Sequence, residues 1–173
     1  MENFVPDIYK ESIYTIDYKK LKQSGIKCLL FDLDNTLVSY RDKLPTKKVK
    51  DLFTKLKKMG FKVIIFSNSG SKRLKPFKEQ LDVDVCSRCF KPSPNKFLYV
   101  INEYKLEVSQ IAIIGDQFYT DIIGGNRVGI TTILINPASK TDMILTYIQR
   151  FREKKLIKKL SKADLFYKGK YYG

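Results

Sequence analysis

The sequence contains no histidine and only three cysteines, and this scarcity bears on metal and redox chemistry. Cys86 and Cys89 form a C-x-x-C pair, but Cys28 is the one remaining cysteine and lies in an expected strand. Four nitrogen or sulfur ligands for zinc are therefore missing. We expect neither a metal nor a redox role for the pair. An odd and small number of cysteines also argues against a disulfide framework and indicates a reducing compartment.

Long apolar runs are also missing. No stretch approaches the roughly 20 apolar residues that a membrane-spanning helix needs. The first residues, MENFVPDIYKES, carry charge throughout and have no apolar core, so they do not resemble a signal peptide. We therefore predict a cytoplasmic protein, with peripheral attachment at the inner face of the membrane as a further expectation.

Acidic residues are few. The 173 residues include 33 Lys and Arg against 18 Asp and Glu, which gives a net charge of +15. Such a field attracts phosphorylated substrates, nucleic acid or an anionic membrane surface. A generally lysine-rich surface in contact with water explains the same count, and the composition does not decide between these readings. The length suits one domain, residues 1–173, with a basic and amphipathic extension over residues 140–173.

Hydrophobic periodicity alternates between the strand and helix patterns along the chain. Parallel pairing with right-handed crossovers and helices on both faces follows from that order, which predicts an α/β fold with a three-layer α/β/α arrangement. Ligands in such folds bind at the carboxyl ends of the strands. The expected strands are 27–33, 62–66, 83–86, 111–115 and 131–135, and the expected helices follow Thr46, Gly70, Ser93 and Gln117, with Ser93 as an N-cap.

Polar side chains follow the expected strands. Asp32 and Asp34 end the first strand, two residues apart and therefore on one face, while Asp116 ends the fourth. These carboxylates, with Asp121 five residues beyond Asp116, form an oxygen-rich set suited to Mg²⁺. Alone, Asp116 is more typical of a turn or a helix cap. Three further residues complete the expected site: Ser67 and Asn68 after the second strand, as neutral donors for phosphoryl oxygens, and Lys91 in FKPSP, as a second cation.

The motifs FDLDNTL, FSNS, KP and GDQFYTD resemble, in order and position, the four motifs of the haloacid dehalogenase (HAD) phosphohydrolase superfamily. The flanking sequences look like the YqeG group of small HAD phosphatases, which is similar to mitochondrial and plastid phosphatidylglycerophosphate phosphatases. The resemblance implies a HAD-like (Rossmannoid) parallel sheet. The short segments between motifs leave no room for a substantial cap domain.

The resemblance also implies the roles of the residues. Asp32 would be the nucleophile that forms an aspartyl-phosphate, and Asp34 the general acid and base. Lys91 would offset charge, Ser67 and Asn68 would bind phosphoryl oxygens, and Thr36 would brace the loop. Mg²⁺ would be held by Asp32, Asp116 and the backbone carbonyl of Asp34, with Asp121 in support. Counting Asp34 as protonated, these charges balance before substrate arrives.

The expected substrate is phosphatidylglycerophosphate, and the expected partners are a phospholipid head group and an anionic membrane. A phosphatase acting on nucleic-acid ends, nucleotides or phosphoproteins is the alternative, and a basic RNA- or ribosome-associated protein without turnover is a second. The binding protein without turnover is less favoured because it has no use for clustered carboxylates, which repel phosphates, and nucleic acid is not a favoured partner. The apolar stripe Ile144, Tyr147, Ile148 and Phe151, interleaved with basic residues, either lies on an anionic bilayer or packs on its own domain. The same question applies to Phe4, Val5, Ile8 and Tyr9 near the N-terminus.

Overall fold

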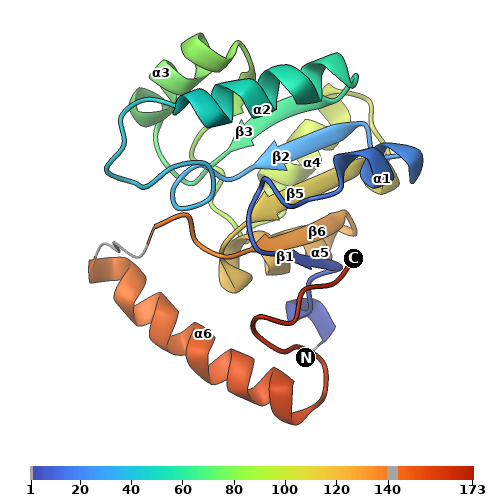
Figure 1. Cartoon of the computed structure of the whole chain (residues 1–173), viewed down its shortest axis with the longest axis vertical. Helices are drawn as coiled ribbons and strands as arrows, with labels where there is room; N and C mark the ends of the chain where they lie inside the picture. Colours follow the sequence, from blue (N-terminus) through green and yellow to red (C-terminus); the bar gives the residue numbers. More distant parts are fainter. Residues whose placement is uncertain (1, 140–143) are drawn as a thin grey trace.

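A six-stranded, all-parallel sheet forms the centre of the computed structural model, which describes residues 2–139 and 144–173 and the side chains of these except 144–149 (Figure 1). The strand order is β1-β6-β5-β2-β3-β4. The strands are β1 (Ile8–Lys10), β2 (Cys28–Phe31), β3 (Lys62–Phe66), β4 (Asp84–Cys86), β5 (Ile111–Gly115) and β6 (Thr131–Ile135). The predicted α/β fold is confirmed, with no large inserted cap among the described residues.

Both faces of the sheet are covered by helices, and the strand residues alternate between two apolar clusters. Leu29 and Phe31 face the cluster that includes α1 (Tyr18–Gln23), α2 (Lys47–Lys58) and α3 (Ser71–Leu81). Cys28 and Leu30 face the opposite cluster, where Phe97 and Val100 of α4 (Asn95–Glu103) pack. Successive side chains of a strand point to opposite faces, and here both faces are buried, so every position within β2 is apolar. Polar residues are therefore found only where this strand ends. The cysteines are buried and unbridged, and the Cys89 Sγ donates to the Cys86 carbonyl at 3.1 Å.

Local chemistry sets the helix boundaries. Thr46 caps α2, because its side chain accepts a hydrogen bond from the Val49 amide. The expectation that Ser93 is the N-cap of α4 is wrong. Pro94 is the N-cap of α4, and it makes no side-chain cap bond. After β5 the chain forms a π-helical turn, Phe118–Ile122, which runs into α5 (Ile123–Val128).

The N-terminal residues pack on the domain. Tyr9 of β1 is buried, and Phe4 and Val5 pack against the same apolar cluster. The last residues return to this edge, where Tyr172 forms an antiparallel bridge with Tyr9 (Figure 1). Sequence periodicity misses β1 and α1. Both are too short to show a recognisable period.

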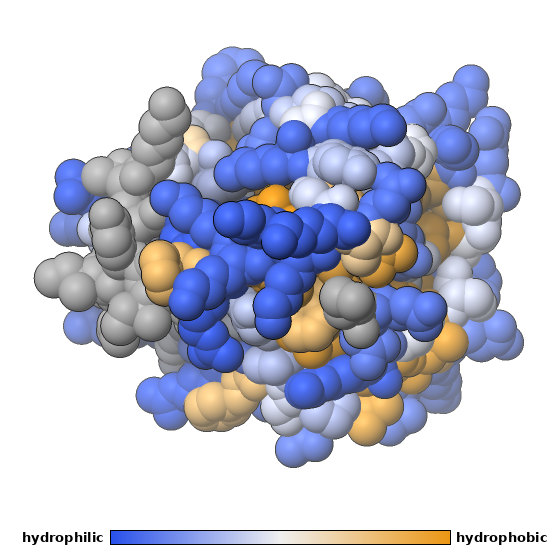
Figure 2. Space-filling model, turned by 90° about the horizontal axis from the view of Figure 1, so that it is seen from below, coloured by the Kyte–Doolittle hydropathy of each residue, from blue (hydrophilic) through white to orange (hydrophobic). Residues whose placement is uncertain are grey.

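The C-terminal helix α6 (Ile144–Lys162) lies across the end of the molecule nearest β1 and β6 (Figure 1). Leu156 and Leu160 are buried in the cluster that holds Tyr9, Phe118 and Phe166. Of the predicted apolar stripe, Phe151 is 59% exposed, while the side chains of Ile144, Tyr147 and Ile148 lie outside the described residues. Figure 2, which views the molecule from the α6 side, shows a largely hydrophilic surface with separated hydrophobic residues. No described helix has the length and apolar character needed to cross a membrane.

Candidate active site

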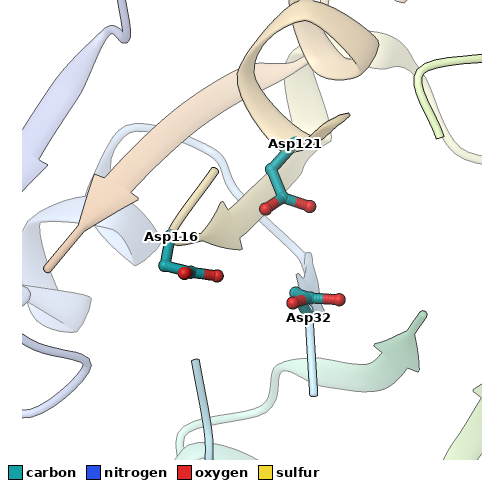
Figure 3. Close-up of side chains that lie close together, drawn as sticks. All are labelled: Asp32, Asp116 and Asp121. Atoms are coloured by element: carbon teal, nitrogen blue, oxygen red, sulfur yellow. The ribbon is translucent and has the colours of Figure 1, made fainter. Parts of the chain in front are cut away.

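Three aspartates meet at the carboxyl edge of the sheet. β2 and β5 are hydrogen-bonded neighbours, so Asp32, which follows β2, lies beside Asp116, which follows β5 (Figure 3). The π-helical turn brings Asp121 back towards them. One carboxylate oxygen from each aspartate lies within 4.8 Å of the others. This edge is also where the strand order reverses, since the chain continues from β2 to β3 on one side and from β5 to β6 on the other.

Asp121 can approach the strand end because the residue at the end of β5 is Gly115. A Cβ atom at that position would lie 2.1 Å from the Asp121 Oδ2. Any side chain there would displace the carboxylate, which is 0% exposed and accepts a hydrogen bond from the Gln117 amide at 3.2 Å. The glycine in the GDQFYTD segment therefore fixes the position of Asp121.

Lys91 is the buried cation of the site. Its Nζ lies 2.8 Å from the Asp32 Oδ1, 2.6 Å from the Asp121 Oδ1 and 3.0 Å from the Phe66 carbonyl. Asn68 holds the Lys91 backbone, because its side chain accepts from the Lys91 amide at 2.7 Å and donates to the Lys91 carbonyl at 3.2 Å. The Asn68 side chain therefore positions Lys91, which the sequence did not anticipate.

The electrostatics indicate a shortage of positive charge around the aspartates. Burial raises the pKa of the Asp32 carboxyl to about 7, against the opposing charge of Lys91. Burial, with repulsion from Asp32 and Asp121, raises the pKa of Asp116 well above its usual range. Burial alone would lower the pKa of Lys91, but the charges of Asp121 and Asp32 outweigh it and raise that pKa.

The donor set fits a hard divalent cation. Three buried carboxylates in mutual reach are the ligands that Mg²⁺ prefers, and a cation between them would favour their ionised forms. Asp34 does not join them through its side chain. Its Oδ1 lies 2.9 Å from the Nη2 of Arg73, and its Oδ2 accepts from the Ser69 hydroxyl at 2.8 Å.

Arg73 changes the charge count expected from the sequence. It reaches Asp34 from α3 and also donates to the Ser39 and Asp42 carbonyls, so it ties Asp34 to the loop before α2. Arg73 therefore places a positive charge beside Asp34 that the count made from the sequence left out.

A cavity of about 210 Å³ opens in front of Asp32. It brings together the expected phosphate-binding residues Ser67, Asn68 and Lys91 with Asp34, and it is also lined by Ser69, Gln117 and Thr120. Ser67 is 2% exposed, and its hydroxyl accepts from the Ser69 amide at 3.1 Å. The cavity is a polar recess large enough to receive a phosphoryl group next to the Asp32 carboxylate.

Two residues of α6 lie at the site, and the sequence did not predict their positions: Arg150 contacts Asp116, and Glu153 contacts the turn that carries Asp121. The Arg150 Nη2 lies 3.2 Å from the Asp116 Oδ2, and the buried Glu153 accepts from the Phe118 amide at 3.0 Å. Burial raises the pKa of Glu153 to about 7. Arg150 and Glu153 are three residues apart, so the sequence predicts that they lie on the same face of a helix. It does not indicate which part of the protein that face contacts. The Thr36 hydroxyl, expected to brace its loop, lies 3.3 Å from the Asp116 Oδ1.

The chain matches a family model described as haloacid dehalogenase-like hydrolase over residues 39–129, more than half its length. It is 34% identical to "Probable phosphatase YqeG" of Bacillus subtilis (strain 168), with 92% of each protein covered. It is also 25% identical to "Phosphatidylglycerophosphate phosphatase 1, chloroplastic/mitochondrial" of Arabidopsis thaliana, over 80% of this chain and 42% of that protein.

Solved structures share the fold. A putative HAD superfamily (subfamily III A) hydrolase from Legionella pneumophila has a TM-score of 0.53 at 21% identity, covering 69% of this chain and 71% of that chain. The 3-deoxy-D-manno-octulosonate 8-phosphate phosphatase of Moraxella catarrhalis has a TM-score of 0.56 at 16% identity, with 70% and 75% covered. The chain therefore belongs to the haloacid dehalogenase-like hydrolases, and it is a phosphatase of that family.

Proposed function

We propose that this phosphatase depends on Mg²⁺, forms an aspartyl-phosphate on Asp32 and acts on phosphatidylglycerophosphate. The observation that carries the mechanism is the meeting of Asp32, Asp116 and Asp121 beside the buried Lys91. Asp32 is the aspartate of this set that lines the cavity, so it is the one that can reach a phosphorus atom there. Asp116 and Asp121 would hold the metal with it.

The proposed reaction has two steps. The Asp32 carboxylate attacks the phosphorus atom, the phosphorus–oxygen bond to the leaving group breaks, and Asp34 gives that alkoxide a proton. A water molecule then attacks the same phosphorus, Asp34 takes a proton from it, and inorganic phosphate and free Asp32 are released. Arg73 would orient Asp34 and balance its charge whenever it is ionised.

Negative charge on the transferred phosphoryl group would be stabilised by a metal ion, by a lysine and by hydrogen-bond donors. Bound Mg²⁺ would neutralise part of the negative charge on the phosphoryl oxygens. Lys91 contributes a buried positive charge next to Asp32. Ser67 and the Asn68 segment line the cavity and can donate hydrogen bonds to the equatorial oxygens, which carry the charge of the transition state.

Three observations support a phospholipid head group as the substrate. Relatives in Arabidopsis thaliana and Chlamydomonas reinhardtii carry the name phosphatidylglycerophosphate phosphatase, each at 25% identity. The cavity has no large cap above it in the described structure, so a head group presented at a surface could enter. A net charge of +15 favours peripheral contact with an anionic membrane.

A phosphatase screen with and without Mg²⁺ tests this proposal. The substrates should include phosphatidylglycerophosphate, a nucleotide, a 5′-phosphorylated oligonucleotide and a phosphopeptide, with Asp32→Asn protein as the control. We expect Mg²⁺-dependent release of phosphate, fastest from phosphatidylglycerophosphate and absent in the variant. Preference for the oligonucleotide, nucleotide or phosphopeptide would overturn the lipid assignment, and substantial activity in Asp32→Asn would overturn the nucleophile.

Liposome co-sedimentation tests the membrane contact separately. We expect the protein to pellet with anionic vesicles at physiological salt and to stay in solution with neutral vesicles. No binding to anionic vesicles would contradict the peripheral attachment.

A further inference from the structure

A second recess lies on the α6 side of the aspartates, apart from the cavity in front of Asp32. It has a volume of about 400 Å³ and is lined by the residues after β6, by Arg150 of α6 and by Lys168 and Gly169 of the C-terminal segment. We call it the α6 groove. Its volume falls in the range of small-molecule sites. The mechanism proposed above leaves it without a role.

Hydrogen bonds between distant parts of the chain hold the floor of the α6 groove. The Gly169 amide donates to the Tyr9 hydroxyl at 3.2 Å, and that hydroxyl donates to the Asn136 Oδ1 at 2.8 Å. The Asn136 Nδ2 in turn donates to the Tyr171 hydroxyl at 2.8 Å. The N-terminal strand, the residues after β6 and the C-terminal segment are thus connected, so the groove is a preformed feature.

The groove is positively charged. Arg150 and Lys168 line it, and no acidic side chain does among the described residues. Two acids lie behind the groove and pair with Arg150: the Asp116 Oδ2 is 3.2 Å from its Nη2, and the Glu153 Oε2 is 3.9 Å from its Nη1. Lys168 is exposed and makes no hydrogen bond or ion pair with the described part of the chain. An anion entering the groove would therefore meet the charge of Lys168 directly and would share Arg150 with Asp116 and Glu153.

The groove also adjoins the active site. Arg150 lines it and lies 3.2 Å from the Asp116 carboxylate. The Ala138 amide donates to the Asn35 carbonyl at 2.7 Å, which ties the residues after β6 to the loop that carries Asp34. A substrate with its terminal phosphate at Asp32 would therefore have this groove on the Asp116 side of the same site.

We propose that the α6 groove binds a second phosphate of the substrate, a phosphodiester that is not hydrolysed, through Arg150 and Lys168. The proposal rests on the phosphatase function given above and specifies its substrate class: a phosphate monoester joined by a short linker to a phosphodiester. A monoester without the second phosphate would use the cavity in front of Asp32 alone and would gain nothing from the groove.

Binding of a phosphodiester on its own tests the groove independently of turnover. Glycerophosphoglycerol contains the diester and no monoester, and its affinity can be measured by calorimetry or NMR titration. Lys168→Glu inverts the charge at the groove, while Lys170→Glu makes the same change two residues away, outside the lining. We expect at least tenfold weaker binding for Lys168→Glu and an unchanged affinity for Lys170→Glu. Absence of binding to wild-type protein, or equal affinities for all three proteins, would overturn the proposal.

Substrate discrimination provides the second test. kcat/KM should be compared for phosphatidylglycerophosphate and for a phosphatidic acid of the same chain length, which has the monoester alone. Lys168→Glu should lower the ratio of the two values at least tenfold, whereas Lys170→Glu, outside the lining, should leave the ratio unchanged. An equal loss on both lipids would contradict the proposal. A wild-type protein that binds the diester but prefers another monoester would overturn the lipid substrate and leave the groove supported.

Discussion

The central sheet and the C-terminal helix α6 both bring charged side chains to the same three aspartates, but they hold those charges differently. Asp32, Asp116, Asp121 and Lys91 come from the strand ends and the segments that follow them, and all are at least nine-tenths buried. Arg150 comes from the side of a helix, and its side chain is 22% exposed. The sheet charges depend on one another for neutralisation, whereas Arg150 meets both Asp116 and water.

This difference in burial supports a division between residues that catalyse the reaction and residues that select the substrate. Buried ionised groups tolerate little change, because removal of one leaves its partner unpaired in a medium of low dielectric. A partly exposed cation at the edge can vary at smaller cost. We therefore assign catalysis to the sheet ends and recognition of the rest of the substrate to α6 and the C-terminal segment.

Replacing Lys91 should have the largest effect. Lys91→Met leaves Asp32 and Asp121 without their buried cation, and we expect a loss of about 3–5 kcal/mol in the free energy of unfolding. Denaturant unfolding measures it, with the exposed Lys72→Met as the matched control. A Lys91→Met protein as stable as the control would mean that the sheet charges do not depend on one another.

Removing a buried side chain of α6 should have the next largest effect. Leu160 is fully buried, so Leu160→Ala should lower the free energy of unfolding by about 2–5 kcal/mol. Phe151→Ala, at an exposed position of the same helix, should change it by about 0.5 kcal/mol or less. Equal effects in thermal unfolding would contradict the packing of α6 on the domain through its Leu160 face.

Addition of Mg²⁺ should stabilise the protein through the sheet-end carboxylates. At a concentration 100 times the dissociation constant the gain is about 2.7 kcal/mol, which raises Tm by several degrees. Differential scanning fluorimetry against Mg²⁺ concentration measures it. Asp116→Asn should remove most of the shift. A shift of the same size in Asp116→Asn would place the ion away from these carboxylates.

The contact between α6 and the turn after β5 should show the smallest effect. Glu153→Ala leaves the buried Phe118 amide without an acceptor and should cost about 1–3 kcal/mol of unfolding free energy. Glu153→Gln keeps an oxygen acceptor and should cost less. A glutamine variant no more stable than the alanine variant would contradict the stabilising role of the hydrogen bond to the Phe118 amide.

The sequence predicts the sheet better than the periphery. β3, β5 and β6 lie where the apolar runs indicate, because a strand buried on both faces has a continuous run of hydrophobic residues in its sequence. The polar residues that follow β2 and β5 identify Asp32, Asp34 and Asp116, since parallel strands bring their carboxyl ends to one edge, and the FKPSP segment identifies Lys91. The FDLDNTL and GDQFYTD motifs then relate these residues to a known chemistry.

What the sequence does not predict depends on how surface elements return to the sheet. Arg150 belongs to a basic segment in which many positions are equivalent by pattern, and its contact with Asp116 is set by the docking of Leu156 and Leu160. Arg73 likewise reaches Asp34 from a helix whose basic residues look alike in sequence. Asn68 was expected to bind phosphoryl oxygens through its backbone, and the sequence gives no sign that its side chain holds the Lys91 backbone.

The most direct test of the central claim is the chemical identification of the phosphorylated residue. Protein mixed with Mg²⁺ and phosphatidylglycerophosphate, quenched during turnover and reduced with borohydride, converts an aspartyl-phosphate to homoserine, which mass spectrometry can locate. We predict homoserine at position 32 and none in a sample without substrate. Homoserine at position 34, or none at either position during measurable turnover, would contradict the account.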